Sequence, residues 1–90
     1  MNNPQRKELR KALDILETVK ELIEEAKGII EEVKDEEQGK FDNLSEGLQA
    51  TEKNQKLEEN ASTLDEAFSS MEEIESSIES IEENINTAIA

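Results

Sequence analysis

Histidine and cysteine are absent from this chain of 90 residues, and its only aromatic residues are two phenylalanines. Without histidine and cysteine there is no thiol nucleophile, no imidazole base, and no usual ligand set for zinc or an iron–sulfur cluster. Glutamates remain as acids and bases, but they are expected on convex helix surfaces without a pocket. We therefore expect a protein that is not an enzyme and that holds no metal or cofactor.

Long apolar runs are also absent. No stretch approaches the roughly 18 apolar residues of a membrane span, and the start, MNNPQRKELRKAL, lacks the apolar segment of a secretory signal. The sequence therefore indicates an intracellular protein.

Positive charge is missing from the last third of the chain. The formal charge is −14, but residues 1–56 hold 10 basic and 14 acidic side chains, whereas residues 57–90 hold 10 acidic ones and no basic one. A field of this sign repels nucleic acid and anionic membranes and attracts basic protein surfaces. We expect a protein partner, with no direct binding of nucleic acid and no membrane.

The sequence does contain a heptad repeat, with apolar residues at alternating steps of three and four. The first run, with Leu9 at position a, is Leu9, Ala12, Leu16, Val19, Ile23, Ala26, Ile30 and Val33. The second run, with Leu64 at position a, is Leu64, Ala67, Met71, Ile74, Ile78, Ile81, Ile85 and Ala88. The pattern predicts a single domain with a helix over about 5–41, a turn over about 42–52 and a helix over about 53–89.

These helices are expected to form an all-α, antiparallel hairpin, in which the numbers of paired residues have a constant sum. Sums of 97 and 90 both align the a and d positions. A sum of 97 places Asn60 opposite Glu37 in a polar layer, whereas a sum of 90 places it against Ile30. We favour 97 because an unpartnered buried amide costs about 1 to 3 kcal/mol.

The e positions, on one flank of the seam, are matched in charge. The first helix carries Lys20, Lys27 and Lys34 there, and the second carries Glu75 and Glu82. Opposite charges at such positions favour the pairing of these two helices.

The g positions of the first helix form a second apolar stripe of Ile15, Leu22 and Ile29, which a two-helix hairpin leaves in water. The g positions of the second helix are small or polar and allow close approach. We therefore expect two hairpins to dimerise into a four-helix bundle. The alternative is a monomer whose stripe receives a foreign protein.

The outer face of the second helix carries acidic residues that repeat every seven residues. This acidic face consists of Glu58, Glu59, Asp65, Glu66, Glu72, Glu73 and Glu79. A solvated face explains it simply, since glutamate favours helices and solubility, but leaves the absence of lysine after Lys56 unexplained. Imitation of DNA is the second explanation. Two carboxylates per heptad give one charge per about 5 Å on one helix and one per about 2.6 Å on two, against about 1.7 Å in duplex DNA.

Two smaller clusters have more than one interpretation. Phe41 and Leu44 are apolar residues in an otherwise polar turn, where they are expected to cap the end of the bundle or, alternatively, to contact a partner. The basic cluster in the first turns of the first helix is expected to pair with the acidic end of the second helix or of a dimer mate or, alternatively, to bind nucleic acid. It consists of Arg6, Lys7, Arg10 and Lys11.

The string EEQGKFDNLSEGLQATEKNQKLEE, residues 36–59, resembles a group of small uncharacterised acidic helical proteins encoded by phages and prophages. Their turn typically reads FDN-L/M-P-E-x-LQ, and Ser45 replaces the usual proline here. The resemblance implies an origin in a mobile element and a location in the bacterial cytoplasm. Small acidic phage proteins often bind and inhibit a host enzyme or defence complex, and anti-restriction and anti-CRISPR proteins that mimic DNA belong to that class.

The leading hypothesis is therefore a non-enzymatic binding protein that engages a host nucleic-acid-handling or defence protein through its acidic face or its turn. The alternative is a structural role, in which the hairpin is a scaffold or adaptor that joins larger coiled-coil assemblies.

Overall fold

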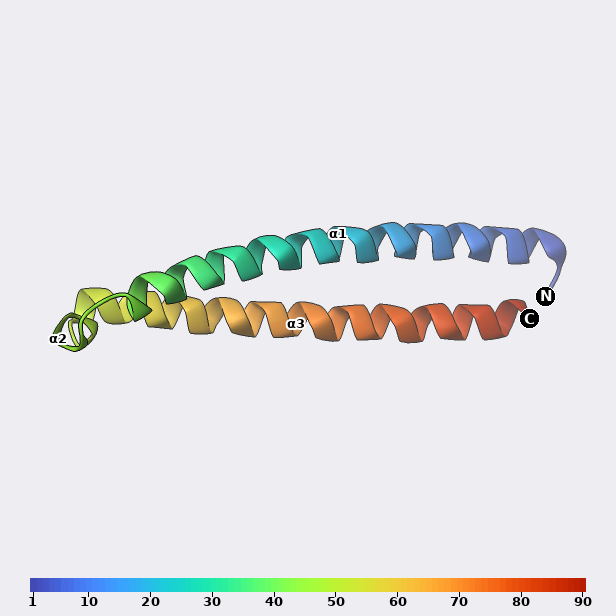
Figure 1. Cartoon of the computed structure of the whole chain (residues 1–90). Coiled ribbons are helices and arrows are strands. Elements are labelled where there is room, and N and C mark those ends of the chain that lie inside the picture. Colours follow the sequence, from blue (N-terminus) through green and yellow to red (C-terminus); the bar gives the residue numbers. More distant parts are fainter.

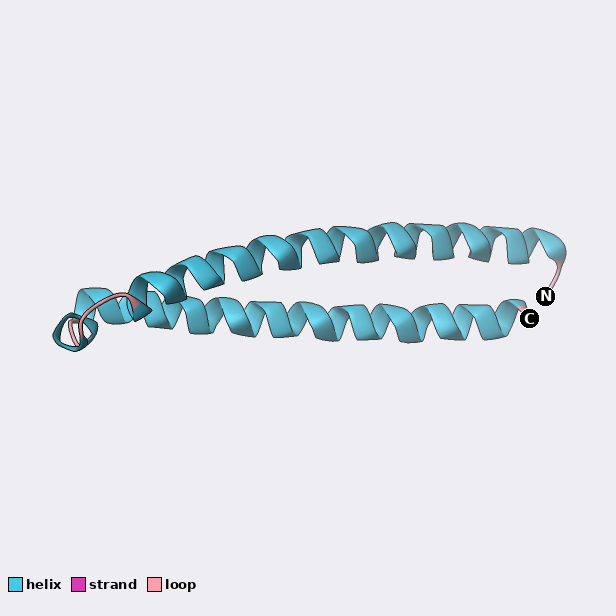
Figure 2. Cartoon of the chain, viewed as in Figure 1, coloured by secondary structure: helices cyan, strands magenta, loops and turns pink.

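The computed structural model describes all 90 residues, and every regular element in it is helical (Figure 2). Helix α1 spans Asn3–Asp42, α2 is one turn of helix at Glu46–Gln49, and α3 spans Glu52–Ile89. Helices α1 and α3 run antiparallel and side by side, with both chain termini at one end and α2 at the other (Figure 1). The predicted all-α hairpin is confirmed. Both long helices begin slightly earlier than predicted, and the predicted turn contains the extra helical turn α2.

Local sequence explains where each helix begins. The Asn2 side chain accepts a hydrogen bond from the Gln5 backbone N–H at 2.9 Å, and the Gln5 side chain accepts one from the Asn2 backbone N–H at 3.1 Å. This reciprocal capping box satisfies two backbone donors, and Pro4 suits the first turn because it lacks an N–H. Thr51 is the N-cap of α3, although its hydroxyl instead donates to the Leu48 carbonyl at 2.8 Å.

The hairpin is long and thin, with almost no core of its own. Its dimensions are 68 × 16 × 14 Å and its radius of gyration is 20.2 Å, whereas a compact domain of this length has a radius of about 12 Å. Only Ala61 and Ile78 are buried. Two helices that contact only each other cannot surround a side chain, so most seam residues remain half-exposed.

The contact face of α3 differs from the predicted one. The heptad pattern placed the d residues Ala67, Ile74, Ile81 and Ala88 in the seam, but all four are exposed. Helix α3 instead packs through its a and e positions, and the buried or half-buried e residues are Ala61, Phe68, Glu75, Glu82 and Ile89. Turning α3 in this direction covers the aromatic ring of Phe68 and brings the two glutamates to the lysines of α1.

The pairing register follows the predicted polar layer. The Asn60 side-chain amide donates to a carboxylate oxygen of Glu37 at 3.4 Å, as a residue sum of 97 requires. The predicted charge match at the e positions is also present. Lys20 contacts Glu82 at 2.8 Å, and Lys27 contacts Glu75 at 2.6 Å.

Candidate functional site

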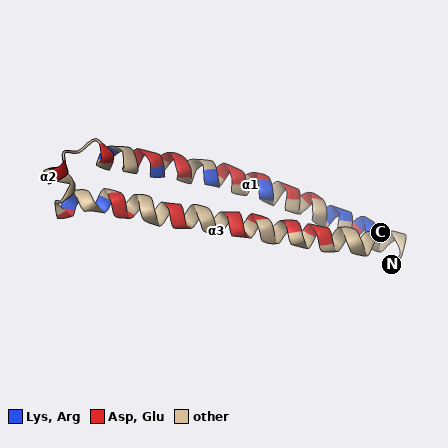
Figure 3. Ribbon diagram, turned by 60° about the horizontal axis from the view of Figure 1, so that its bottom comes forward, with Lys and Arg blue, Asp and Glu red and all other residues tan.

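The acidic face lies along the outside of α3, and all seven of its side chains are exposed. Figure 3 shows acidic residues along both long helices, whereas the basic residues of α3 are confined to the end near α2. A continuous helix of 38 residues holds these carboxylates at fixed spacing. The face is therefore a rigid row of charge rather than a pocket.

Most of these carboxylates have no cationic neighbour. Asp65 contacts Lys34 at 3.5 Å, and Glu59 contacts Lys56 at 3.6 Å. The other five form no ion pair. These are Glu58, Glu66, Glu72, Glu73 and Glu79. A basic surface approaching this part of α3 would meet charges that the protein itself does not neutralise.

Two of the lysines at the e positions of α1, Lys20 and Lys27, neutralise acids outside the acidic face. Lys20 lies between Glu17 and Glu82, at 2.8 Å from each, and these hydrogen bonds raise the pKa of Lys20. The hydrogen bond donated by Lys20 lowers the pKa of Glu17. Glu82 lies at the seam, so Lys20 closes one side of the hairpin there and leaves the acidic face charged.

Lys27 repeats the arrangement one heptad later. Its ammonium group contacts Glu75 at 2.6 Å and Glu24 at 3.3 Å, which raises the pKa of Lys27. The same nitrogen lies 4.9 Å from the centre of the Phe68 ring, within the range of a cation–π interaction. The side chain of Lys27 is only 12% exposed.

The basic cluster near the N-terminus does not pair with acidic residues of α3, which corrects that part of the prediction. Arg6 donates to the backbone carbonyl of Ile89 at 2.9 Å and so satisfies one of the free carbonyls at the end of α3. Lys11 contacts Glu8 within α1 at 2.8 Å. Lys7 and Arg10 form no ion pair and remain exposed, so no acidic residue of α3 neutralises this end of the hairpin.

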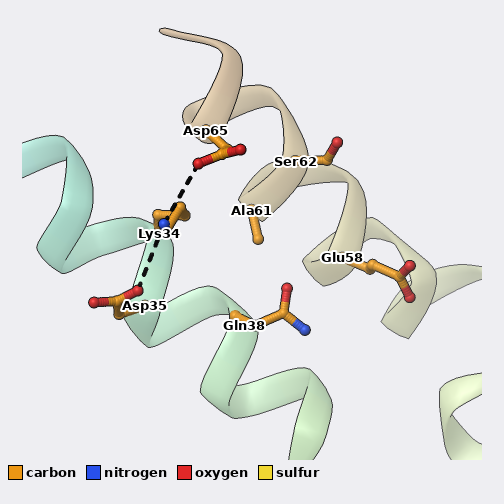
Figure 4. Close-up of a pocket in the computed structure, with 7 residues that line it drawn as sticks. All are labelled: Lys34, Asp35, Gln38, Glu58, Ala61, Ser62 and Asp65. Atoms are coloured by element: carbon orange, nitrogen blue, oxygen red, sulfur yellow. Dashed lines mark hydrogen bonds and ion pairs between the residues drawn. The ribbon is translucent and has the colours of Figure 1, made fainter. Parts of the chain in front are cut away.

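One shallow groove of about 390 Å³ lies between α1 and α3 on the e side. It is lined by Lys34, Asp35, Gln38, Glu58, Ala61, Ser62 and Asp65. Lys34 lies between Asp35 and Asp65 and already contacts both (Figure 4). No group of three or more acidic side chains in the chain converges closely enough to hold a metal ion.

The opposite side of the hairpin is apolar. The predicted stripe is exposed, with Ile15 at 64%, Leu22 at 59% and Ile29 at 60%. Because the e residues pair across one side of the seam, the g residues of α1 and the adjacent d residues of α3 share the other side. Together they form the apolar side, which consists of Ile15, Leu22, Ile29, Val33, Ile74 and Ile81.

Sequence reasoning missed half of this apolar side. Val33, Ile74 and Ile81 were assigned to the seam, but they are 41%, 50% and 47% exposed. The available signal was the third apolar column on the second helix, where Ala61, Phe68 and Ile89 stand at e. A helix with apolar residues at a, d and e cannot turn all three columns towards a single neighbour.

The turn residues are partly covered. Phe41 and Leu44 are half-buried, and the Leu44 N–H donates to the Phe41 carbonyl at 3.1 Å. The Gln49 side chain donates to the same carbonyl, also at 3.1 Å. Leu48 of α2 is 51% exposed, so the tip of the hairpin presents one apolar side chain to solvent.

No helix is long and apolar enough to cross a membrane. Comparisons with protein-family models, with curated proteins and with solved structures found no match. The resemblance of residues 36–59 to phage-encoded proteins stays a prediction, and the function must be argued from the surfaces of this chain alone.

Proposed function

We propose that this chain is a non-enzymatic acidic protein that binds a basic surface of another protein, of the kind with which nucleic-acid-handling or defence proteins hold DNA. The observation that carries the proposal is the acidic face of α3, where five exposed carboxylates have no ion pair and no lysine or arginine follows Lys56. A row of fixed carboxylates offers the same charge and similar acceptor atoms as a phosphate backbone.

The charge spacing supports DNA mimicry by two copies better than by one. Two carboxylates per heptad give one charge per about 5 Å along α3, whereas duplex DNA has one per about 1.7 Å. Helix α1 adds less unneutralised negative charge than its sequence predicts, because Glu17 contacts Lys20 and Glu24 contacts Lys27. Two α3 helices side by side reach one charge per about 2.6 Å.

The proposal therefore includes a homodimer, in which two hairpins form a four-helix bundle. The exposure of Ile15, Leu22 and Ile29 supports it, since a contiguous apolar stripe in water favours association. The place of action is the cytoplasm of a bacterial host, and the gene is of phage origin. Both statements rest on the resemblance of residues 36–59.

The test is affinity capture from bacterial lysate with a variant in which the carboxylates of the acidic face are made neutral. The changes are Glu58→Gln, Glu59→Gln, Asp65→Asn, Glu66→Gln, Glu72→Gln and Glu73→Gln. The wild type is expected to capture one dominant nucleic-acid-handling protein at low salt and to lose it at high salt, because exposed charges are screened within about 3 Å at 1 M. The variant is expected to capture none while keeping its helical circular dichroism.

A matched control removes the same charge from α1, using exposed acids that form no ion pair. The changes are Asp14→Asn, Glu21→Gln, Glu25→Gln, Glu31→Gln, Glu32→Gln and Glu36→Gln. This control is expected to retain more of the partner than the α3 variant. If both variants capture the partner as the wild type does, the acidity is only a solvated face.

The apolar side favours a second candidate function, a structural scaffold or adaptor that assembles with other coiled coils. A scaffold would tolerate the changes on the acidic face and would fail when Ile15, Leu22 or Ile29 is made polar. Capture of assembly proteins that resist high salt would favour this second function over the first.

A further inference from the structure

We propose that a second copy of this chain covers the apolar side, with the two hairpins antiparallel, so that their turns lie at opposite ends. In this dimer α1 packs on α1 and α3 packs on α3. The inference rests on the homodimer of the proposed function and adds how the two copies are arranged. The arrangement does not depend on what the acidic face binds, so the dimer geometry and the binding of a partner can be disproved by different experiments.

The hairpin exposes more surface than a compact monomeric protein of the same mass. Its solvent-accessible area is 6483 Å², whereas a compact monomer of 10.2 kDa exposes about 5,300 Å². The excess of about 1,200 Å² is somewhat more than the roughly 800 Å² that each partner buries in a stable interface of standard size. One copy of a rod of the same length is the right size to cover it.

The g column of α1 and the d column of α3 are each symmetric in spacing about one central residue. On α1, Ile15 and Ile29 lie seven residues on either side of Leu22, and on α3, Ala67 and Ile81 lie seven residues on either side of Ile74. A two-fold axis through Leu22 therefore pairs Ile15 of one copy with Ile29 of the other.

The two centres coincide along the hairpin. In the register marked by the contact between Asn60 and Glu37, Ile74 lies at about the same height along the hairpin as Ile23, the neighbour of Leu22. One axis therefore serves both helices, and on α3 it pairs Ile81 with Ala67 of the second copy, a large residue with a small one. Isologous interfaces need this self-complementarity.

Charges beside the apolar side of α1 decide the direction. Position c adjoins position g on a helix, and the c column of α1 is Lys11, Thr18, Glu25 and Glu32. An antiparallel partner, paired about Leu22, brings Lys11 beside Glu32 and Thr18 beside Glu25. Opposite charges then meet at two places in the dimer, whereas Glu8, which Lys11 contacts at 2.8 Å within its own chain, comes opposite Glu36 of the second copy.

The column beside the apolar side of α3 carries no charge. Position g adjoins position d, and the g column of α3 is Thr63, Ser70, Ser77 and Asn84. Antiparallel α3 helices therefore meet through apolar and neutral side chains. A parallel dimer would instead place α1 against α3 of the second copy, where this neutral g column offers Lys11 no acidic partner.

The first experiment is sedimentation equilibrium of the full chain. The wild type is expected at twice the monomer mass of 10.2 kDa. A monomer at all concentrations up to the highest soluble one would overturn the proposal and leave the apolar side to a different protein.

The second experiment fixes the direction by disulfide formation, since the chain has no cysteine of its own. Two cysteines cross-link only when their Cα atoms lie within about 7 Å. Leu22→Cys, on the axis between neighbouring α1 helices, is expected to form a covalent dimer on mild oxidation.

Matched controls come from the same exposed stripe. A chain with only Ile15→Cys, or only Ile29→Cys, is expected to form no covalent dimer, because the same cysteine of the second copy lies about 21 Å away along the helix. The two mixed together are expected to cross-link to each other. Failure of Leu22→Cys to cross-link in a proven dimer, or equal cross-linking by Ile15→Cys alone, would overturn the antiparallel arrangement.

Discussion

The two sides of the seam between α1 and α3 differ in how far their side chains are covered. On the e side, Lys20 and Lys27 reach across to Glu82 and Glu75, and Phe68 packs beneath one of these ammonium groups. On the apolar side, no charged pair crosses the seam, and large side chains remain 41% to 64% exposed. The comparison teaches that ion pairs can close one side of a hairpin within one chain, whereas an apolar stripe on the other side remains exposed to solvent.

The largest expected effect comes from breaking the seam itself. Ile78 is 6% exposed at an a position of α3, so Ile78→Ala removes a buried side chain and is expected to lower the free energy of unfolding by about 2 to 5 kcal/mol. Thermal denaturation followed by circular dichroism measures this. Ile81→Ala is the matched control, three residues along the same helix but 47% exposed. Equal losses from the two variants, measured at low protein concentration, would contradict the distinction between seam and apolar side.

The next effect concerns the apolar side alone. Leu22→Gln leaves the contact between α1 and α3 intact, because Leu22 is 59% exposed in the hairpin. Burying the exposed part of Leu22 contributes about 1 to 2 kcal/mol, so losing one leucine from each copy is expected to raise the Kd of the proposed dimer by about 20-fold or more. Sedimentation equilibrium measures this Kd. Leu48→Gln, which removes a similarly exposed leucine from α2, should leave it unchanged, and an equal effect of both variants would mean that the apolar side is not the interface.

A smaller effect is expected from the ion pairs on the e side. Hydrogen bonds with Glu17 and Glu82 raise the pKa of Lys20 above its ordinary 10.5, and Glu75 and Glu24 do the same for Lys27. The folded state therefore holds these protons more tightly than the unfolded chain. Their stabilisation is complete below pH 10.5 and is lost as the pH rises through the raised values.

The melting temperature is therefore expected to change little up to pH 10.5 and to fall as the pH is raised from there to about 12. The double variant Lys20→Gln, Lys27→Gln should show a smaller fall, since it has already lost both pairs. A fall of the same size in the variant would show that deprotonation of the other lysines, and not of these two, sets the alkaline limit.

Much of the fold was predictable from the sequence. The steps of three and four identify the two long helices, and the polar residues between them identify the turn. Asn60 opposite Glu37 and the e-position lysines opposite Glu75 and Glu82 also follow, because a polar group in a seam requires a partner. For the candidate site, the exposure of the acidic face and of Ile15, Leu22 and Ile29 was predicted correctly. The helical turn α2 was not predicted, because four residues are too few to show a repeating pattern of apolar positions.

The sequence by itself determined that the chain forms two long helices, that they pair antiparallel, and where the charges stand along them. Only the tertiary structure decided which columns of α3 face α1. That helix has apolar residues at a, d and e, and a single neighbour can cover about two columns. The choice depends on both surfaces at once, because turning towards e covers Phe68 and joins two ion pairs. It thereby leaves Ile74 and Ile81 beside Leu22 on the open side.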